Sequence, residues 1–174
     1  MSKEIIKREK QKVLFKQMNT ETNFVSGTDH PMGLHCVFYE LENGDLATFF
    51  TLDKWCEGHK GFGHGGMCYM VLDEVMGRSN RIYDASQGMS YTPVMTGEIT
   101  CRYVSPAPLG ERLYAYGRVI SSDGRKRITS GEILLEDGTV VVRGTGVYFQ
   151  VPFVSPSEYS DEPDPFTEDD PKEL

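Results

Sequence analysis

The sequence has 174 residues, a formal net charge of −8 at pH 7 and four cysteines. This length is typical of one domain with a sizeable core, and the acidic balance excludes the concentrated basic face of a nucleic-acid-binding domain. No apolar run is long enough to cross a bilayer, and no secretory signal is evident. The cysteines show no CxxC spacing, so we expect free thiols in a cytoplasmic protein (Cys36, Cys56, Cys68 and Cys101).

The first 22 residues are predicted to form an N-terminal helix and linker. Ser2–Asn19 mixes apolar residues with six basic and two acidic ones, a pattern typical of an amphipathic helix. Such a helix either docks on the body of the protein or touches a membrane surface, and docking is the commoner outcome. One short helix is too little for a helix-turn-helix DNA-binding motif.

Residues 23–153 carry the signals of an antiparallel sheet. Asn43-Gly44 and Asp137-Gly138 are strong hairpin signals, and the turns between the later strands are too short for parallel crossovers. The predicted strands cover His35–Leu41, Leu46–Leu52, Gly97–Val104, Glu111–Ser121, Lys126–Leu135 and Thr139–Val151.

Between the second and third strands, residues 61–77 read GFGHGGMCYMVLDEVMG. The stretch opens as a glycine-rich loop and continues as an almost wholly apolar segment. It predicts a helix buried on most sides, with Gly77 as its C-cap. One long helix against an antiparallel sheet is an α+β arrangement.

Acidic residues are concentrated at the C-terminal end. From Ser157 to Leu174 eight Asp and Glu residues stand against one lysine, a net charge of −7, so the rest of the chain is close to neutral. Prolines interrupt this stretch repeatedly. We expect residues 154–174 to form a disordered acidic tail.

The start of the predicted helix combines two features that suit acyl chemistry. Its glycines leave the first N–H groups unpaired at the positive end of the helix dipole, where they suit an oxygen carrying negative charge. Further along, Asp73 and Glu74 are the only charged residues between Gly66 and Gly77, and a buried carboxylate is costly unless something pairs or uses it. The alternative is structural, with glycines that form a sharp loop and a carboxylate on the solvent side of the helix.

The same glycines fit the dinucleotide fingerprint GxGxxG at Gly61–Gly66. That motif requires a strand directly before it and a parallel βαβ unit around it, whereas here a polar loop precedes it and hairpins follow. His59 and His64 lack a third ligand at metal-binding spacing. The sequence therefore predicts neither a cofactor nor a metal.

The motif His64-Gly65-Gly66, followed eleven residues later by Gly77, resembles the HGG…LDExxG signature of hot-dog-fold acyl-CoA thioesterases. The branch that it resembles is the phenylacetate-degradation and 4-hydroxybenzoyl-CoA type. Residues 103–110 and 144–146 are similar to later family segments, and the resemblance spans about residues 23–151. The sequence departs from some relatives at Asn23 and Ser26, which stand where those relatives carry cysteines. The resemblance implies a hot-dog fold, an antiparallel sheet wrapped around one long central helix.

The resemblance also implies an activity, hydrolysis of an acyl-CoA thioester to the free acid and coenzyme A. The Gly65 N–H, beside that of Gly66, would hold the thioester oxygen, and Asp73 would act as base or nucleophile. Thr96 matches a hydroxyl that assists the attacking water, and His64 would either donate to the substrate or order the loop. Glu74 points about 100° away from Asp73 around the helix, so we expect it to be a structural ion-pair residue.

Helix geometry adds a prediction about assembly. Gly65 and Asp73, eight residues apart on one helix, would lie roughly 12 Å apart, so one chain cannot present both to one carbonyl carbon. We therefore expect a homodimer, or a homotetramer as a dimer of dimers, with shared active sites. The phosphates of coenzyme A would need cations, and Arg125, Lys126 and Arg127 are candidates. The alternative is that these three residues form a solvated hairpin without a binding role.

The alternative function is a non-catalytic acyl-CoA-binding or assembly module. A hot-dog dehydratase is a weaker alternative, because no His–Asp pairing is found.

Overall fold

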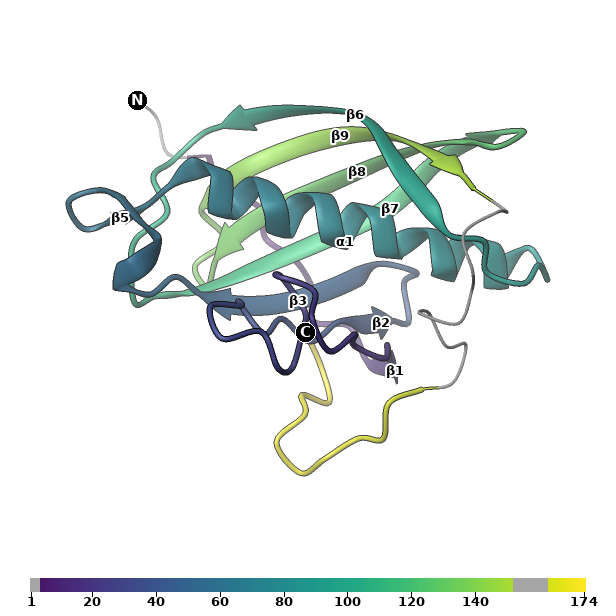
Figure 1. Cartoon of the computed structure of the whole chain (residues 1–174), viewed down its shortest axis with the longest axis horizontal. Coiled ribbons are helices and arrows are strands. Elements are labelled where there is room, and N and C mark those ends of the chain that lie inside the picture. Colours follow the sequence, from purple (N-terminus) through teal and green to yellow (C-terminus); the bar gives the residue numbers. More distant parts are fainter. Residues whose placement is uncertain (1–3, 152–162) are drawn as a thin grey trace.

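The computed structural model describes residues 4–151 and 163–174. A seven-stranded antiparallel sheet wraps around one long helix, α1 (Gly65–Ser86) (Figure 1). The sheet order is β1-β2-β3-β7-β8-β9-β6, which confirms the predicted α+β hot-dog fold. Its strands are β1 (Val13–Lys16), β2 (Tyr39–Leu41), β3 (Leu46–Thr51), β6 (Val94–Tyr103), β7 (Arg112–Asp123), β8 (Lys126–Leu135) and β9 (Val140–Gln150).

A small second sheet precedes α1. It consists of β4 (Glu57–His59) and β5 (Phe62–Gly63), after a 3₁₀ turn at Lys54–Cys56. The hairpin ends at the first turn of α1, where the His64 N–H donates to the Cys56 carbonyl at 2.7 Å. It was not predicted, but it holds the glycine-rich loop in place.

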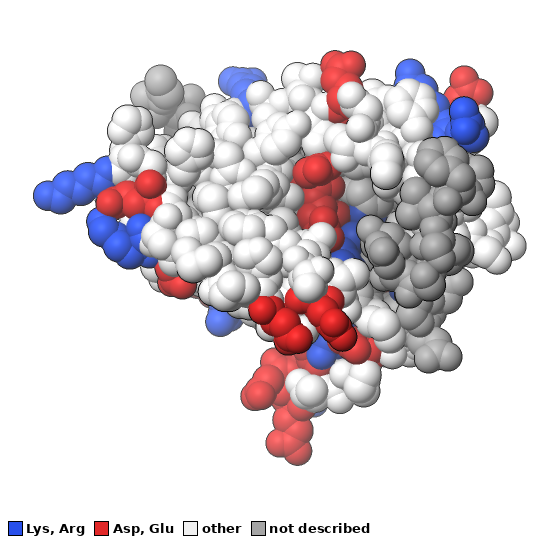
Figure 2. All heavy atoms as spheres, viewed as in Figure 1, with Lys and Arg blue, Asp and Glu red and all other residues white. Residues whose placement is uncertain are grey.

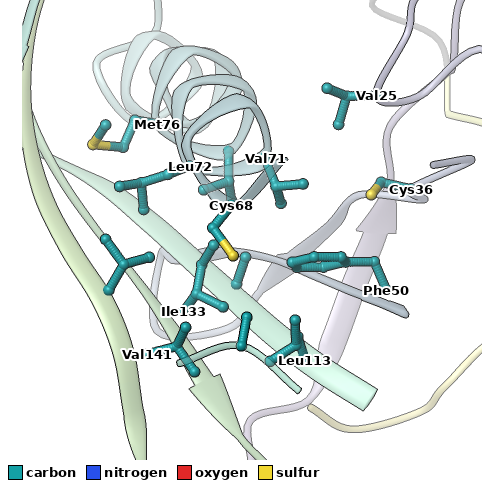
Figure 3. Close-up of a cluster of buried hydrophobic side chains, with 14 of the residues drawn as sticks. Val25, Cys36, Phe50, Cys68, Val71, Leu72, Met76, Leu113, Ile133 and Val141 are labelled. Carbon is teal, nitrogen blue, oxygen red and sulfur yellow. The ribbon is translucent and has the colours of Figure 1, made fainter. Parts of the chain in front are cut away.

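One face of α1 packs on the sheet and forms the main core (Figure 3). Apolar residues at helical spacing lie on this face and are completely buried (Val71, Leu72, Val75 and Met76). Burying one such side chain contributes about 1.5–3 kcal/mol. They meet inward-facing residues of the strands, among them Phe50, Leu113, Ile133 and Val141.

The helix is longer than predicted, because Gly77 does not end it. α1 continues to Ser86 and is capped at Gln87. The polar residues after Gly77 are compatible with a buried helix because their side chains find partners: Ser79 and Asn80 both donate back to the Met76 carbonyl, at 2.7 and 3.3 Å. The polar stretch that follows Gly77 is therefore part of the helix.

The predicted N-terminal helix is wrong. Residues 4–17 are mostly extended, and β1 pairs with β2. The segment also exchanges hydrogen bonds with the β8–β9 turn, where the Ile6 N–H donates to the Gly138 carbonyl at 2.9 Å. It covers a second apolar cluster on the opposite side of the sheet from α1, and this burial outweighs the local helix propensity of the segment. The buried residues of this cluster are Val13, Tyr39, Leu41, Ala47, Tyr116, Leu134 and Val140.

The predicted disordered tail is wrong for residues 163–174, while residues 154–162 lie outside the described part. Gln11 and Leu174 exchange backbone hydrogen bonds of 2.7 and 3.0 Å. Asp170 accepts hydrogen bonds from the side chains of Tyr39 at 2.6 Å and Lys16 at 3.0 Å. The C-terminal segment thus lies along β1 and covers that edge of the sheet.

None of the helices in the described residues is long and apolar enough to span a membrane.

Candidate functional site

The first turn of α1 is the first of two clusters on the helix. His64 is the N-cap, and its Nδ1 accepts a hydrogen bond from the Gly66 N–H at 3.0 Å. Because Nδ1 is the acceptor, the neutral ring carries its proton on Nε2. The arrangement matches the loop-ordering role considered for His64, and it occupies the Gly66 N–H that was expected to bind substrate.

The Gly65 N–H is free in the described residues, where no acceptor for it is found. The Tyr103 hydroxyl donates to the Gly65 carbonyl at 2.9 Å, and the Tyr103 ring lies 3.2 Å from where a Cβ on Gly65 would stand. Burial, with smaller effects of Cys101, Cys68 and Tyr69, raises the pKa of Tyr103, so it remains a donor. A free N–H at the start of a long helix can bind a negatively charged oxygen.

The second cluster surrounds Asp73, two turns along the helix. Asp73 Oδ1 accepts a hydrogen bond from Thr96 Oγ1 at 2.9 Å and another from the Tyr148 hydroxyl at 2.8 Å. Tyr148 is buried, and burial together with the Asp73 charge raises its pKa. A phenol that stays protonated is a dependable donor to a carboxylate.

The sequence analysis named Asp73 and Thr96, and the structure brings these two residues together. The sequence analysis missed Tyr148. The available signal was the alternation Gly144-x-Gly146-x-Tyr148 near the end of the last strand. Small residues at two inward positions leave room for a large ring at the third: a Cβ on Gly146 would lie 2.4 Å from the Tyr148 ring.

Glu74 has the structural role expected of it. It forms an ion pair with Arg78, with 2.7 Å between Glu74 Oε1 and Arg78 Nε. Arg78 also donates to the Met18 carbonyl at 3.1 Å and to Ser26 Oγ at 3.0 Å. The pair therefore ties α1 to the loop that follows β1 and leaves Asp73 as the carboxylate directed at Thr96.

Two hollows accompany the two clusters. One of about 290 Å³ lies beside Gly65 and is lined by Gly63, Cys68, Tyr103 and Pro106, among others. A smaller one of about 90 Å³ lies beside Asp73, Gly77 and Thr96. Since α1 is continuous between the clusters, eight residues separate Gly65 from Asp73 by about 12 Å.

The three basic residues predicted to bind the phosphates of coenzyme A differ in burial. Arg127 is buried, and it donates to Asp84 Oδ1 at 3.2 Å, to Ser122 Oγ at 2.6 Å and to the Gly124 carbonyl at 2.8 Å. Assigning Arg127 to substrate binding is therefore corrected: it is a structural residue whose donors are directed inward. Arg125 and Lys126 are exposed on the β7–β8 hairpin.

Within residues 4–151 and 163–174, no group of three or more His, Cys, Asp or Glu side chains is placed to hold a metal ion.

Comparison with known proteins finds a matching family model and a related chain. Residues 60–142 match the model of the thioesterase superfamily. The acyl-coenzyme A thioesterase THEM4 of Xenopus laevis is 29% identical over 107 residues, which are 62% of this chain and 45% of THEM4. The chain thus spans less than half of that relative.

Solved structures share the fold. A crystal structure described as a thioesterase superfamily protein has a TM-score of 0.66 and 32% identity, covering 75% of this chain and 61% of that one. The PaaI protein of the E. coli phenylacetic acid degradation operon has a TM-score of 0.60 and 14% identity, covering 68% of this chain and 80% of PaaI.

Proposed function

We propose that this chain, whose residues 60–142 match the model of the thioesterase superfamily, is a thioesterase that hydrolyses an acyl-CoA thioester to the free acid and coenzyme A. The observation that carries the proposal is the Asp73 carboxylate of α1, which two strand hydroxyls orient. The first turn of the same helix offers a free N–H among the described residues. A protein that only binds acyl-CoA has no need of such a carboxylate.

The proposed chemistry is attack of water on the acyl carbon. The thioester oxygen gains negative charge, which the Gly65 N–H stabilises; losing one such donor typically costs on the order of 100-fold or more in rate. Asp73 takes the proton of the water, or attacks the carbon itself to give an anhydride that water then opens. The C–S bond breaks, and the thiolate of coenzyme A leaves and is protonated.

Each active site is proposed to combine two subunits. The two clusters lie at opposite ends of β6, where Tyr103 contacts Gly65 and Thr96 contacts Asp73. If β6 pairs antiparallel with β6 of a second copy, each Gly65 comes to face the partner's Asp73. That pairing is available because β6 is the last strand of the sheet and no strand of residues 4–151 or 163–174 pairs with its outer side, while the C-terminal segment covers the β1 edge.

The surface on the α1 side suits such a dimer. Large apolar or aromatic side chains of α1, β6 and β9 stay exposed (Tyr69, Met95, Tyr103 and Phe149). Figure 2 shows a broad uncharged area on this side, beside an acidic stripe near its middle. Exposed apolar surface of this kind marks interaction sites. A dimer of dimers is the alternative assembly.

Arg125 and Lys126 remain our candidates for the phosphates of coenzyme A. They lie on the hairpin near the C-terminal end of α1, away from Gly65 of their own chain. Antiparallel pairing of two copies would carry this end of the partner's helix past Gly65. The two cations would therefore serve the site across the interface.

The test is thiol release from a panel of short, aromatic and long acyl-CoAs. We expect the wild type to turn over at least one class, Asp73→Asn to lose at least about 100-fold in kcat, and Glu74→Gln to stay within severalfold. A loss of kcat in Glu74→Gln but not in Asp73→Asn would show that Glu74, and not Asp73, is the catalytic carboxylate. No turnover, with acyl-CoA still bound, would favour the non-catalytic binding module instead.

A further inference from the structure

We propose that Tyr148 is a positioning residue for Asp73: its hydroxyl, together with that of Thr96, holds Oδ1 and leaves Oδ2 as the oxygen that meets the water or the acyl carbon. The inference rests on the proposed function, because it assigns the working oxygen of the proposed base.

Both donors converge on one oxygen of the carboxylate. Thr96 Oγ1 and the Tyr148 hydroxyl lie 2.9 and 2.8 Å from Oδ1, whereas no group of residues 4–151 or 163–174 donates to Oδ2. An ionised carboxylate has about four lone-pair positions. The two on Oδ1 are occupied, so Oδ2 keeps its lone pairs for chemistry.

Tyr148 is itself held rigidly. Its side chain is 1% exposed, and its ring lies against Gly146 and Gly77, 2.4 and 3.4 Å from where a Cβ on each would stand. The hydroxyl also lies 3.0 Å from the Asp73 backbone carbonyl, so a single phenol contacts both the main chain and the side chain of the same residue. Such a contact restricts the rotation of the carboxylate about its side-chain bonds.

The two donors come from different strands and differ in exposure. Thr96 is exposed on the edge strand β6, while Tyr148 is buried on β9. Tyr148 therefore fixes the carboxylate from inside the subunit, before a partner or a substrate arrives. Because it faces Asp73 from the buried side, it acts through Asp73 and not on the substrate.

The test compares Tyr148→Phe with Tyr39→Phe. Tyr39 is a matched control: it is equally buried, and its hydroxyl donates to Asp170 at 2.6 Å on the opposite side of the sheet. We expect Tyr148→Phe to lower kcat by roughly tenfold or more, since hydrogen bonds to charged groups are the strong ones, with KM within about twofold. Tyr39→Phe should change neither.

A second readout does not depend on turnover. The chemical shift of the Asp73 carboxyl carbon, assigned by its loss in Asp73→Asn, is measured by ¹³C NMR at neutral pH. Tyr148→Phe should shift this resonance in one direction, because Oδ1 loses a donor, and 3-fluorotyrosine at position 148, which keeps the ring but is a stronger donor, should shift it in the other direction. The fluorinated variant serves if Tyr148→Phe does not fold.

The outcomes separate the two proposals. A wild type without turnover, but with an Asp73 carboxyl resonance that shifts as expected in the variants, would overturn the thioesterase function and keep the Tyr148 contact. An active wild type, with an Asp73 carboxyl resonance and a kcat that neither variant changes, would overturn the role of Tyr148. Equal losses in Tyr148→Phe and Tyr39→Phe would reduce that role to fold stability.

Discussion

The clearest stability prediction concerns Arg127. Its guanidinium and the Asp84 carboxylate are both buried and form a 3.2 Å ion pair between the C-terminal end of α1 and β8. In Arg127→Met a side chain of similar length fills the space, but the Asp84 charge loses its cationic partner. Thr92 N–H and Gln150 Nε2 still donate to Asp84, at 3.2 and 3.4 Å.

Removing one partner of a buried ion pair typically costs about 3–5 kcal/mol. The two remaining donors favour the lower end, about 3 kcal/mol. For a chain of this size each kcal/mol shifts Tm by about 2–4 °C, so Arg127→Met should melt roughly 6–12 °C below the wild type.

The assay is urea unfolding followed by two probes, together with a thermal melt. Lys126→Met is the control: its side chain is exposed, so its unfolding free energy should stay within about 0.5 kcal/mol of the wild type. An Arg127→Met variant as stable as the wild type, with a raised KM for acyl-CoA, would refute the structural assignment and restore Arg127 as a substrate contact.

Two further predictions concern the core and the C-terminal segment. Leu72→Ala, at a completely buried position, should cost about 2–5 kcal/mol by urea unfolding, and a loss below about 1 kcal/mol would mean that α1 packs less tightly than described. Burial would raise the pKa of Asp170, but hydrogen bonds from Tyr39, Thr167 and Lys16 outweigh it and lower the pKa to about 2. The docking that Asp170 supports is therefore present above pH about 3.9, the unfolded value, and is lost as the pH falls through about 2. Protection of residues 163–174 against hydrogen exchange should fall over that pH range, and it should also fall at neutral pH in Asp170→Asn. Unchanged protection in both experiments would contradict the role of Asp170 in docking this segment.

Much of the fold was accessible from local signals. Asn43-Gly44 and Asp137-Gly138 marked hairpins that the structure contains, and the apolar run after Gly66 marked the central helix. The N-terminal segment was mispredicted because its helical propensity loses to pairing with β2. The end of α1 was missed because buried polar residues such as Ser79 find partners that depend on the helix itself.

The candidate site was accessible only in part. The residues of the helix motif, Gly65 and Asp73, and the strand residue Thr96 could be named from pattern and resemblance. Tyr148 could not, because its role depends on a contact across 75 positions of the sequence. Arg127 was misassigned for the same reason: its partner Asp84 lies 43 positions away in the sequence, on the part of α1 beyond Gly77.

The most direct test of shared active sites is subunit mixing. Gly65→Pro removes the N–H and adds a ring at the first helical position, where proline is tolerated because His64 has an extended ψ of 134°. Gly65→Ala, which adds a Cβ but keeps the N–H, is its control. Random mixing of Gly65→Pro with Asp73→Asn makes about half of the dimers mixed, each with one intact site of two.

Thiol release by this mixture is therefore expected to reach about a quarter of the wild-type rate, while each parent alone stays at least about 100-fold below the wild type. A mixture no more active than the sum of its two parents would contradict a site built from Gly65 of one subunit and the partner's Asp73.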